Sequence, residues 1–160
     1  MKSTAQSKTN EAIKQLPQSV LRMRLPQLGQ LPDGDLGLFL FADERPLSGM
    51  SGILDWRLCG RLSRMLQEET FAGRRQEKLL TLFSLFGKQR RLFLFGLGDV
   101  AHFHADVAAD VGRAAWDTIR AAGCQRLVLL LPYSRTRAEV LFQFYEGLPK
   151  PPQGLPVSYI

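Results

Sequence analysis

The sequence predicts an α/β fold in which a mixed sheet lies between two layers of helices. In the second half of the chain, apolar runs of strand length alternate with segments of helical period, which indicates parallel crossovers. Residues 79–86 and 92–97 are two such runs joined by a short connection, and they predict a hairpin or tight pair. The run 127–131 is apolar throughout, as expected for a strand covered on both faces.

Two further strands are expected near the beginning of the chain. Residues 19–25 alternate between arginine and apolar side chains, which predicts an edge or half-exposed strand. Residues 31–35 have the composition of a turn. The apolar run 36–41 that follows predicts a buried strand.

Three helices are expected, over residues 54–69, 104–122 and 136–148. In the second, Gly123 is a natural stop, and Asp110 and Arg113 are spaced to pair. Its predicted buried stripe is Val107, Val111, Ala114, Thr118 and Ala122, and its predicted exposed side is Asp106, Asp110, Arg113, Asp117 and Arg120.

Length and composition fit one cytoplasmic domain. The 160 residues divide into a flexible leader (1–17), a folded domain (18–148) and a proline-rich tail (149–160). Hydrophobic residues make up 45% of the chain, which argues against global disorder. No apolar run is long enough to span a bilayer or to act as a secretion signal. Cys59 and Cys124 are expected as reduced thiols near the core.

The net charge of +6 is concentrated in one segment. Residues 56–91 contain nine basic and three acidic residues, and the remainder of the chain is balanced. Arg57, Arg61 and Arg64 share one side of the expected helix, and a solvated helix face is the simpler reading of them. A polyanion-binding surface, including nucleic acid, is the alternative. It would comprise Arg57, Arg61, Arg64, Arg74, Arg75, Arg90 and Arg91.

Glycine-containing sequence after the strand 92–97 suggests a second candidate site. Gly96, Gly98 and Asp99 stand between a strand and a helix, where backbone N–H groups can bind a phosphate. Ala101 replaces the third glycine of the dinucleotide fingerprint, and Asp99 would repel an anion, so a structural turn is favoured. His102 and His104 are too few ligands to predict a metal site. No cofactor and no nucleophilic catalytic motif are expected.

The last helix carries apolar residues on more than one side. Its expected inner stripe is Ala138, Leu141, Phe142, Tyr145 and Leu148. Val140 and Phe144 then form a second ridge, which predicts either an interface with another chain or cover from the tail folding back.

Several segments together resemble the N-terminal domain of the leucyl aminopeptidases. The resemblance covers roughly residues 20–147. The segments are Phe41-Ala42-Asp43-Glu44, Leu47-Ser48-Gly49, Leu54-Asp55, Gly60 with Leu62 and Leu66, Phe71-Ala72-Gly73-Arg74, residues 91–98, the alanine pairs Ala108-Ala109 and Ala114-Ala115, and Leu131-Pro132.

This resemblance implies a macro-domain-like fold and a non-catalytic role. In that family the peptidase chemistry lies in a second domain that holds two metal ions, and its Asn-Thr-Asp-Ala-Glu-Gly-Arg-Leu signature is absent from this sequence. We therefore expect a binding or assembly module that forms a homo-oligomer or joins a separately encoded peptidase-like partner, and not an enzyme. The alternatives are a nucleic-acid-binding regulator and a binder of an ADP-ribose-like ligand.

Overall fold

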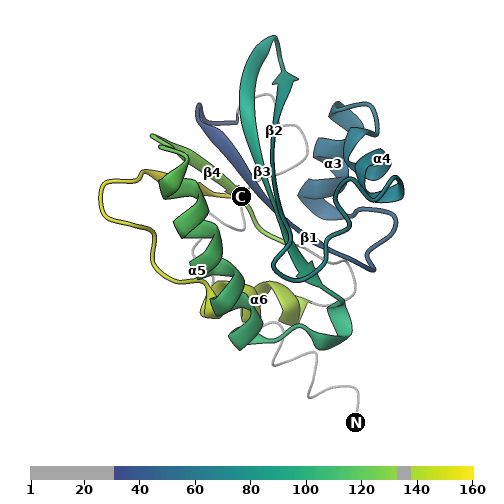
Figure 1. Ribbon diagram of the computed structural model, residues 1–160, viewed down its shortest axis with the longest axis vertical. Helices are drawn as coiled ribbons and strands as arrows, with labels where there is room; N and C mark the ends of the chain where they lie inside the picture. Colours follow the sequence, from purple (N-terminus) through teal and green to yellow (C-terminus); the bar gives the residue numbers. More distant parts are fainter. Residues whose placement is uncertain (1–30, 133–137) are drawn as a thin grey trace.

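The computed structural model describes residues 31–132 and 138–160, in which a five-stranded mixed sheet separates two pairs of helices (Figure 1). The strand order is β2-β3-β1-β4-β5, and only the β2–β3 pair is antiparallel. The strands are β1 Asp35–Phe41, β2 Lys78–Leu85, β3 Lys88–Gly98, β4 Leu127–Leu130 and β5 Val157–Tyr159. The helices are α3 Gly49–Arg57, α4 Arg61–Gln67, α5 Ala105–Ala121 and α6 Ala138–Gly147, with a short 3₁₀ turn, η2, at Val100–His102.

The central strands divide their side chains by size between the two faces. In β1, Leu36, Leu38 and Leu40 join the core beneath α3 and α4. Phe39 and Phe41 alternate with them and join the core beneath α5 and α6. The strand period of two residues produces this division. The same alternation continues in β3, so the sheet has a leucine-rich face and a phenylalanine-rich face.

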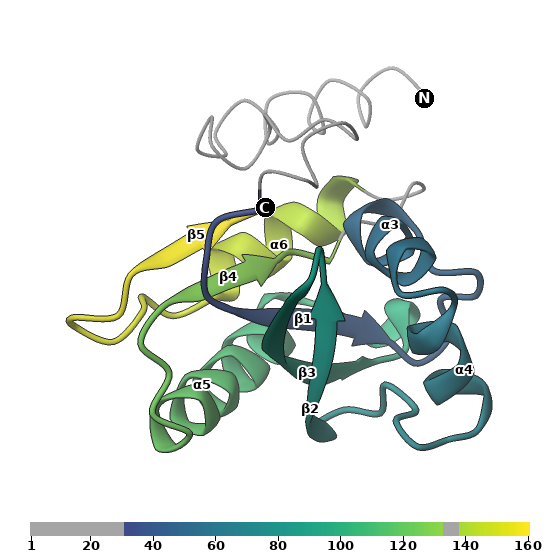
Figure 2. The ribbon, with the colours of Figure 1, turned by 90° about the horizontal axis from the view of Figure 1, so that it is seen from above.

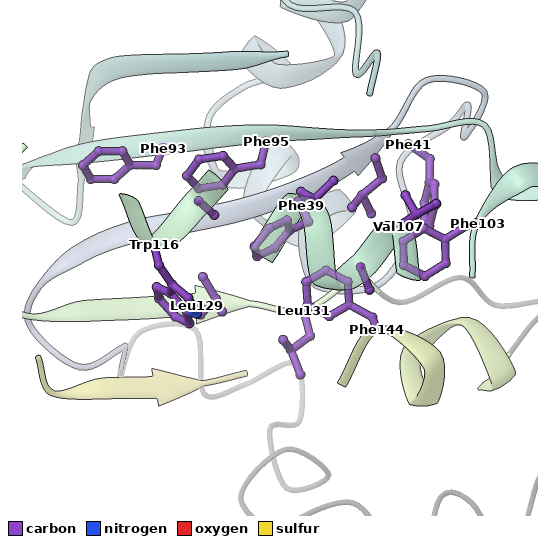
Figure 3. Packing of buried hydrophobic residues seen from close by; sticks show 14 of the residues in the cluster. Phe39, Phe41, Phe93, Phe95, Phe103, Val107, Trp116, Leu129, Leu131 and Phe144 are labelled. Carbon is purple, nitrogen blue, oxygen red and sulfur yellow. The ribbon is translucent and has the colours of Figure 1, made fainter. Parts of the chain in front are cut away.

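The phenylalanine-rich core is bridged to the last helix by ring contacts (Figure 3). The rings of Phe39 and Phe144 lie 4.6 Å apart in an edge-on arrangement, and the rings of Phe103 and Phe144 are 6.2 Å apart. Such pairs add to the stabilisation from buried area. Phe144 therefore anchors α6 to the sheet.

The predicted second ridge of the last helix is thus its buried face. Val140 and Phe144 are buried in the chain's own core, and Phe142, Tyr145 and Leu148 are only partly buried. The prediction of an exposed Val140–Phe144 interface was wrong. Apolar residues on several sides of a short helix do not reveal which side meets the sheet.

The buried stripe of α5 is also rotated from the predicted one. Val107 and Val111 are buried as expected, but Ala114, Thr118 and Ala122 are half-buried. The reason is the chain that follows α6: a side chain at Gly112 would lie 2.6 Å from Pro149 Cδ, and Trp116 donates a hydrogen bond to the Pro149 carbonyl at 2.9 Å. The buried residues are Val107, Ala108, Val111, Gly112, Ala115, Trp116 and Ile119.

One predicted helix, 54–69, is two helices. The chain turns at Cys59 and Gly60, whose φ angles are 53° and 76°. The Asp55 carboxylate crosses this break and accepts the N–H groups of Leu62, at 2.7 Å, and Ser63, at 3.1 Å, which stabilises the beginning of α4. Cys59 is consequently exposed and not near the core, whereas Cys124 is partly buried, and both thiols are free.

The proline-rich tail contains a strand that the sequence did not predict. β5 pairs in parallel with β4, and Figure 2 shows the two side by side. Leu131 donates to the Ile160 carbonyl at 2.7 Å, and Ile160 donates to the Leu129 carbonyl at 2.9 Å. Four prolines between residues 149 and 156 hide this strand from a pattern search.

The other predicted elements are confirmed: the strand 36–41, the hairpin, the buried strand 127–131 and the helix at 104–122. The helix predicted at 136–148 is confirmed over Ala138–Gly147, and residues 136 and 137 lie outside the described residues. The pairing of Asp110 with Arg113 is also present. The predicted leader and the strand 19–25 lie outside the described residues. No helix in the described ranges combines the length and the apolar character needed to cross a bilayer.

Replacing Phe144 tests the assignment of the buried face of α6. Because Phe144 is fully buried against Phe39, Phe144→Ala should lower the free energy of unfolding by about 3–5 kcal/mol. Phe86→Ala is the matched control, because Phe86 is half exposed, and it should cost less than about 1 kcal/mol. Urea denaturation measures both. If both substitutions lowered the free energy of unfolding by the same small amount, Phe144 would not be buried as described.

Candidate functional site

The seven arginines of the basic segment do not form one surface. Arg90 and Arg91 lie near the beginning of β3, whereas Arg75 lies beside Gly98 at its end. At about 3.3 Å per residue, Arg91 and Gly98 are roughly 23 Å apart along the strand. Arg57, Arg61 and Arg64 occupy a third place, on α3 and α4. Each group therefore has its own surroundings and its own role.

Arg90 and Arg91 hold the fold together. Arg90 donates to the Pro32 carbonyl at 2.9 Å and contacts the Asp33 carboxylate at 3.2 Å. Arg91 is paired with Asp35 at 2.5 Å and donates to the Ala122 carbonyl at 2.6 Å. It thereby ties β3 to the beginning of β1 and to the end of α5. Their guanidinium groups are engaged within the chain and are not free for a polyanion.

The pKa values of Asp35 and Cys124, which lie beside Arg91, are shifted in opposite directions. Burial of Asp35 opposes its ionisation, but hydrogen bonds from Arg91 and Cys124 outweigh that effect and hold the pKa of the carboxyl below its usual value. Burial, together with the Asp35 carboxylate, raises the pKa of the Cys124 thiol to about 11. Cys124 is therefore a neutral thiol at pH 7, not an activated nucleophile.

Arg74 and Arg75 lie at the carboxyl ends of β1 and β3, and each is paired with a carboxylate. Arg74 contacts Glu69 and Arg75 contacts Asp110, both at 2.9 Å. They border a cleft of about 300 Å³, whose lining also includes Gly98, Asp99 and His102. A cleft at this end of parallel strands is a common ligand position.

Three backbone amides of the glycine loop beside this cleft already have hydrogen-bond partners within the chain. Gly96 donates to the Glu77 carbonyl and Gly98 to the Gly73 carbonyl, both at 2.9 Å, and Val100 donates to Asp43 Oδ1 at 3.0 Å. A phosphate would have to displace these bonds. Gly96 does not line the cleft at all. The amides of Gly96 and Gly98 are therefore not available as phosphate donors, which argues against the predicted use of Gly96, Gly98 and Asp99.

Gly96 is instead required for close packing. A Cβ there would lie 1.9 Å from the Arg74 carbonyl oxygen, so the segment that follows α4 crosses the sheet in direct backbone contact. Glu77 fixes this segment by accepting the N–H groups of Ala72 at 3.0 Å and Arg74 at 2.9 Å. Glycine is therefore required at this position by the close approach of another backbone segment, and no ligand is needed to explain it.

The two histidines lie beside different carboxylates. His102 Nδ1 is 3.8 Å from Asp99, and His104 Nδ1 is 3.9 Å from Asp106. Within residues 31–132 and 138–160, no three His, Cys, Asp or Glu side chains converge as a metal site would require.

Arg57, Arg61 and Arg64 differ from the other four in having no acidic partner among the described residues. The predicted single stripe is interrupted, because Arg57 ends α3 and the other two lie on α4. All three nevertheless lie on the side of the molecule that carries the β2–β3 hairpin. The Arg57 guanidinium is 4.8 Å from the Trp56 ring and 5.5 Å from the Phe86 ring. Arg61 donates to Thr81 at 3.4 Å.

Four exposed apolar side chains on and near the β2–β3 hairpin were missed at the sequence level. Trp56 is 69% exposed, Leu82 60%, Phe86 52% and Leu80 47%. A signal was present, because residues 79–86 are apolar at both odd and even positions, the pattern of a strand buried on both faces. β2 is at the end of the sheet and is covered on one face only, so the second apolar row remains exposed.

The profile of the cytosol aminopeptidase family, N-terminal domain, matches residues 36–150 of this sequence. The chain belongs to this family. The match begins in β1 and ends just after α6, so it includes both helical layers and all the strands except β5. The expected resemblance to the N-terminal domain of leucyl aminopeptidases is confirmed.

Solved structures extend the comparison to the fold of this aminopeptidase N-terminal domain. A mutant of tomato leucine aminopeptidase superposes on it with a TM-score of 0.54 and 18% sequence identity. The aligned region covers 82% of this chain and 30% of the tomato chain. The chain therefore spans about a third of the length of that relative. A search of curated proteins gave no match.

The structural role of Arg91 predicts a specific dependence of stability on pH. Asp35→Asn should lower the free energy of unfolding at pH 7 by about 1–2 kcal/mol, because it removes the charged partner of Arg91. The native pKa of Asp35 is depressed, so its stabilisation is complete above its unfolded pKa of about 3.9 and is lost as the pH falls through the lower native value.

Denaturation of the wild type and of Asp35→Asn from pH 7 to pH 2.5 measures this dependence. The difference between the two proteins should be constant down to about pH 5 and should shrink below about pH 4. Asp117→Asn, at an exposed carboxylate paired with Arg120, is the control and should show little difference. A difference between wild type and Asp35→Asn that grows on acidification would contradict this role of Asp35.

Proposed function

We propose that this aminopeptidase N-terminal domain acts as a non-catalytic binding and assembly module. The observation that carries the proposal is that the family match belongs to the N-terminal domain type. The contacts of the candidate cleft also support it, since the amides of Gly96 and Gly98 and the bordering arginines already have partners within the chain. The described surface carries exposed apolar side chains and arginines, which are residue types found in protein–protein interfaces.

The partner that fits this proposal is a separately encoded, peptidase-like protein. A homodimer through Val140 and Phe144 has lost its basis, because both residues are buried in the core. The exposed thiol of Cys59 and the free thiol of Cys124 suit a reducing compartment. We therefore place the module in the cytoplasm.

The two alternative functions have less support. A nucleic-acid surface needs cations arranged along one face, and four of the seven arginines are paired with carboxylates. An ADP-ribose-like ligand needs amides for its phosphates, and those of Gly96 and Gly98 are bonded internally. Neither random-sequence DNA in a mobility-shift assay nor ADP-ribose in a thermal-shift assay should show binding.

An assay of hydrolysis tests the non-catalytic proposal. The pure protein with Zn²⁺ or Mn²⁺ should release no p-nitroaniline from leucyl-p-nitroanilide above the buffer rate. Two-metal hydrolysis needs both ions held by protein ligands. A complete leucyl aminopeptidase in the same buffer is the positive control. Metal-dependent release that co-elutes with the protein in gel filtration would overturn the proposal.

A further inference from the structure

The edge of the sheet at β2 is open to an additional strand. Among the described strands, β2 has a neighbour on the β3 side only. Lys78 donates to Thr118 of α5 at 3.2 Å, which places the even-numbered side chains of β2 on the α5 face. Beyond Lys78 that face is uncovered, and Leu80 and Leu82 are exposed there. Figure 1 shows the β2–β3 hairpin projecting past the helices.

A groove runs along the other face of the same edge. It has a volume of about 520 Å³ and lies between α4 and β2. Met65 and Leu79 provide apolar lining, and Arg61 and Arg64 provide two cations. Glu68 is the one carboxylate that lines it. The groove thus combines an apolar floor with a net positive charge.

The tip of the hairpin continues this surface. Phe86 and Trp56 are both more than half exposed, and the Arg57 guanidinium lies within 5.5 Å of each ring centre. Phe86 has a φ of 52°, a left-handed conformation that is uncommon for a bulky residue. An aromatic pair with a cation between its members is typical of the anchoring residues of protein interfaces.

Charge argues for the nature of the occupant. A second copy would bring Arg57, Arg61 and Arg64 toward their own like charges. The first 30 residues of this chain carry five basic residues and one acidic residue, so they would be repelled as well. Exposed leucines on a strand edge suit a peptide backbone with apolar side chains better than a phosphate backbone. The complementary occupant is acidic and extended.

We propose that the β2 edge, with the α4 groove and the hairpin tip, docks an extended segment of a partner protein that alternates acidic and apolar residues. The segment adds to the sheet as a strand, its main chain bonding to the free edge of β2. Its carboxylates pair with Arg61 and Arg64, and its apolar side chains cover Leu80 and Leu82. This inference rests on the proposed binding function and specifies its surface.

Tryptophan fluorescence measures the docking directly. Trp56 is exposed, whereas Trp116, a residue of α5, is buried, so a strand covering the hairpin should shift the emission to shorter wavelength through Trp56. The probe is a capped ten-residue peptide of alternating Glu and Val. It should bind with a Kd that weakens as salt is added. The matching Lys–Val peptide should not bind.

Two sets of variants locate the site. Arg61→Glu with Arg64→Glu should weaken binding at least about tenfold, and Leu80→Ser with Leu82→Ser should weaken it by a similar factor. Arg113→Glu with Arg120→Glu makes the same charge change on α5 and should change Kd less than about twofold. Circular dichroism checks that each variant is folded. If the double arginine variant does not fold, the double leucine variant still tests the site.

Each outcome decides the inference. Absence of peptide binding, equal weakening by the α5 control, or binding of single-stranded DNA in place of the peptide would overturn it. Dimerisation of the free protein that depends on Leu82 would also overturn it, by making a second copy the occupant. If the peptide does not bind and leucyl-p-nitroanilide is not hydrolysed, only the proposed docking surface is rejected. If leucyl-p-nitroanilide is hydrolysed, the proposed non-catalytic function is rejected.

Discussion

Burial of the central strands on both faces is the constraint on which this fold depends. In β1 every residue after Asp35 is buried, so apolar side chains point in both directions and the sheet needs cover on each side. Leucines on one face lie beneath α3 and α4, and phenylalanines on the other lie beneath α5 and α6. The two helical layers satisfy that requirement.

The same constraint explains why the candidate surface lies at β2. The helices cover β1, β3 and β4, and no described element covers the outer part of β2 on the α5 face. Arginines near the covered part of the sheet are paired within the chain. Arg91, for example, joins β3 to β1 and to α5. Arg61 and Arg64, beside the uncovered strand, have no acidic partner in the described ranges. The arginines that are paired with carboxylates and those without an acidic partner thus lie at different places on the domain.

The sequence predicted the elements whose own periodicity defines them, such as the strand 36–41 and the helix 104–122. It did not predict features that depend on distant contacts. The break within the predicted helix 54–69 is stabilised by Asp55, which accepts the N–H group of Leu62 on the far side of the break. The buried side of α6 is set by the contact of Phe144 with Phe39. The phosphate-binding reading of Gly96 lost its support because the N–H of Gly96 donates to the carbonyl of Glu77, a residue distant in the sequence. The basic segment was visible in the sequence, but its division into paired and unpaired arginines follows from the carboxylates that the fold brings near.

Amide hydrogen exchange of the free protein tests most directly whether the sheet has a doubly covered centre and an available edge. Amides of β1, β3 and β4 should exchange only through global unfolding, while those on the free side of β2 should exchange through local opening at least about a hundredfold faster, a difference of about 2.7 kcal/mol. Slow exchange throughout β2, equal to that of β1, would mean that its edge is already covered in the free protein and would contradict the account.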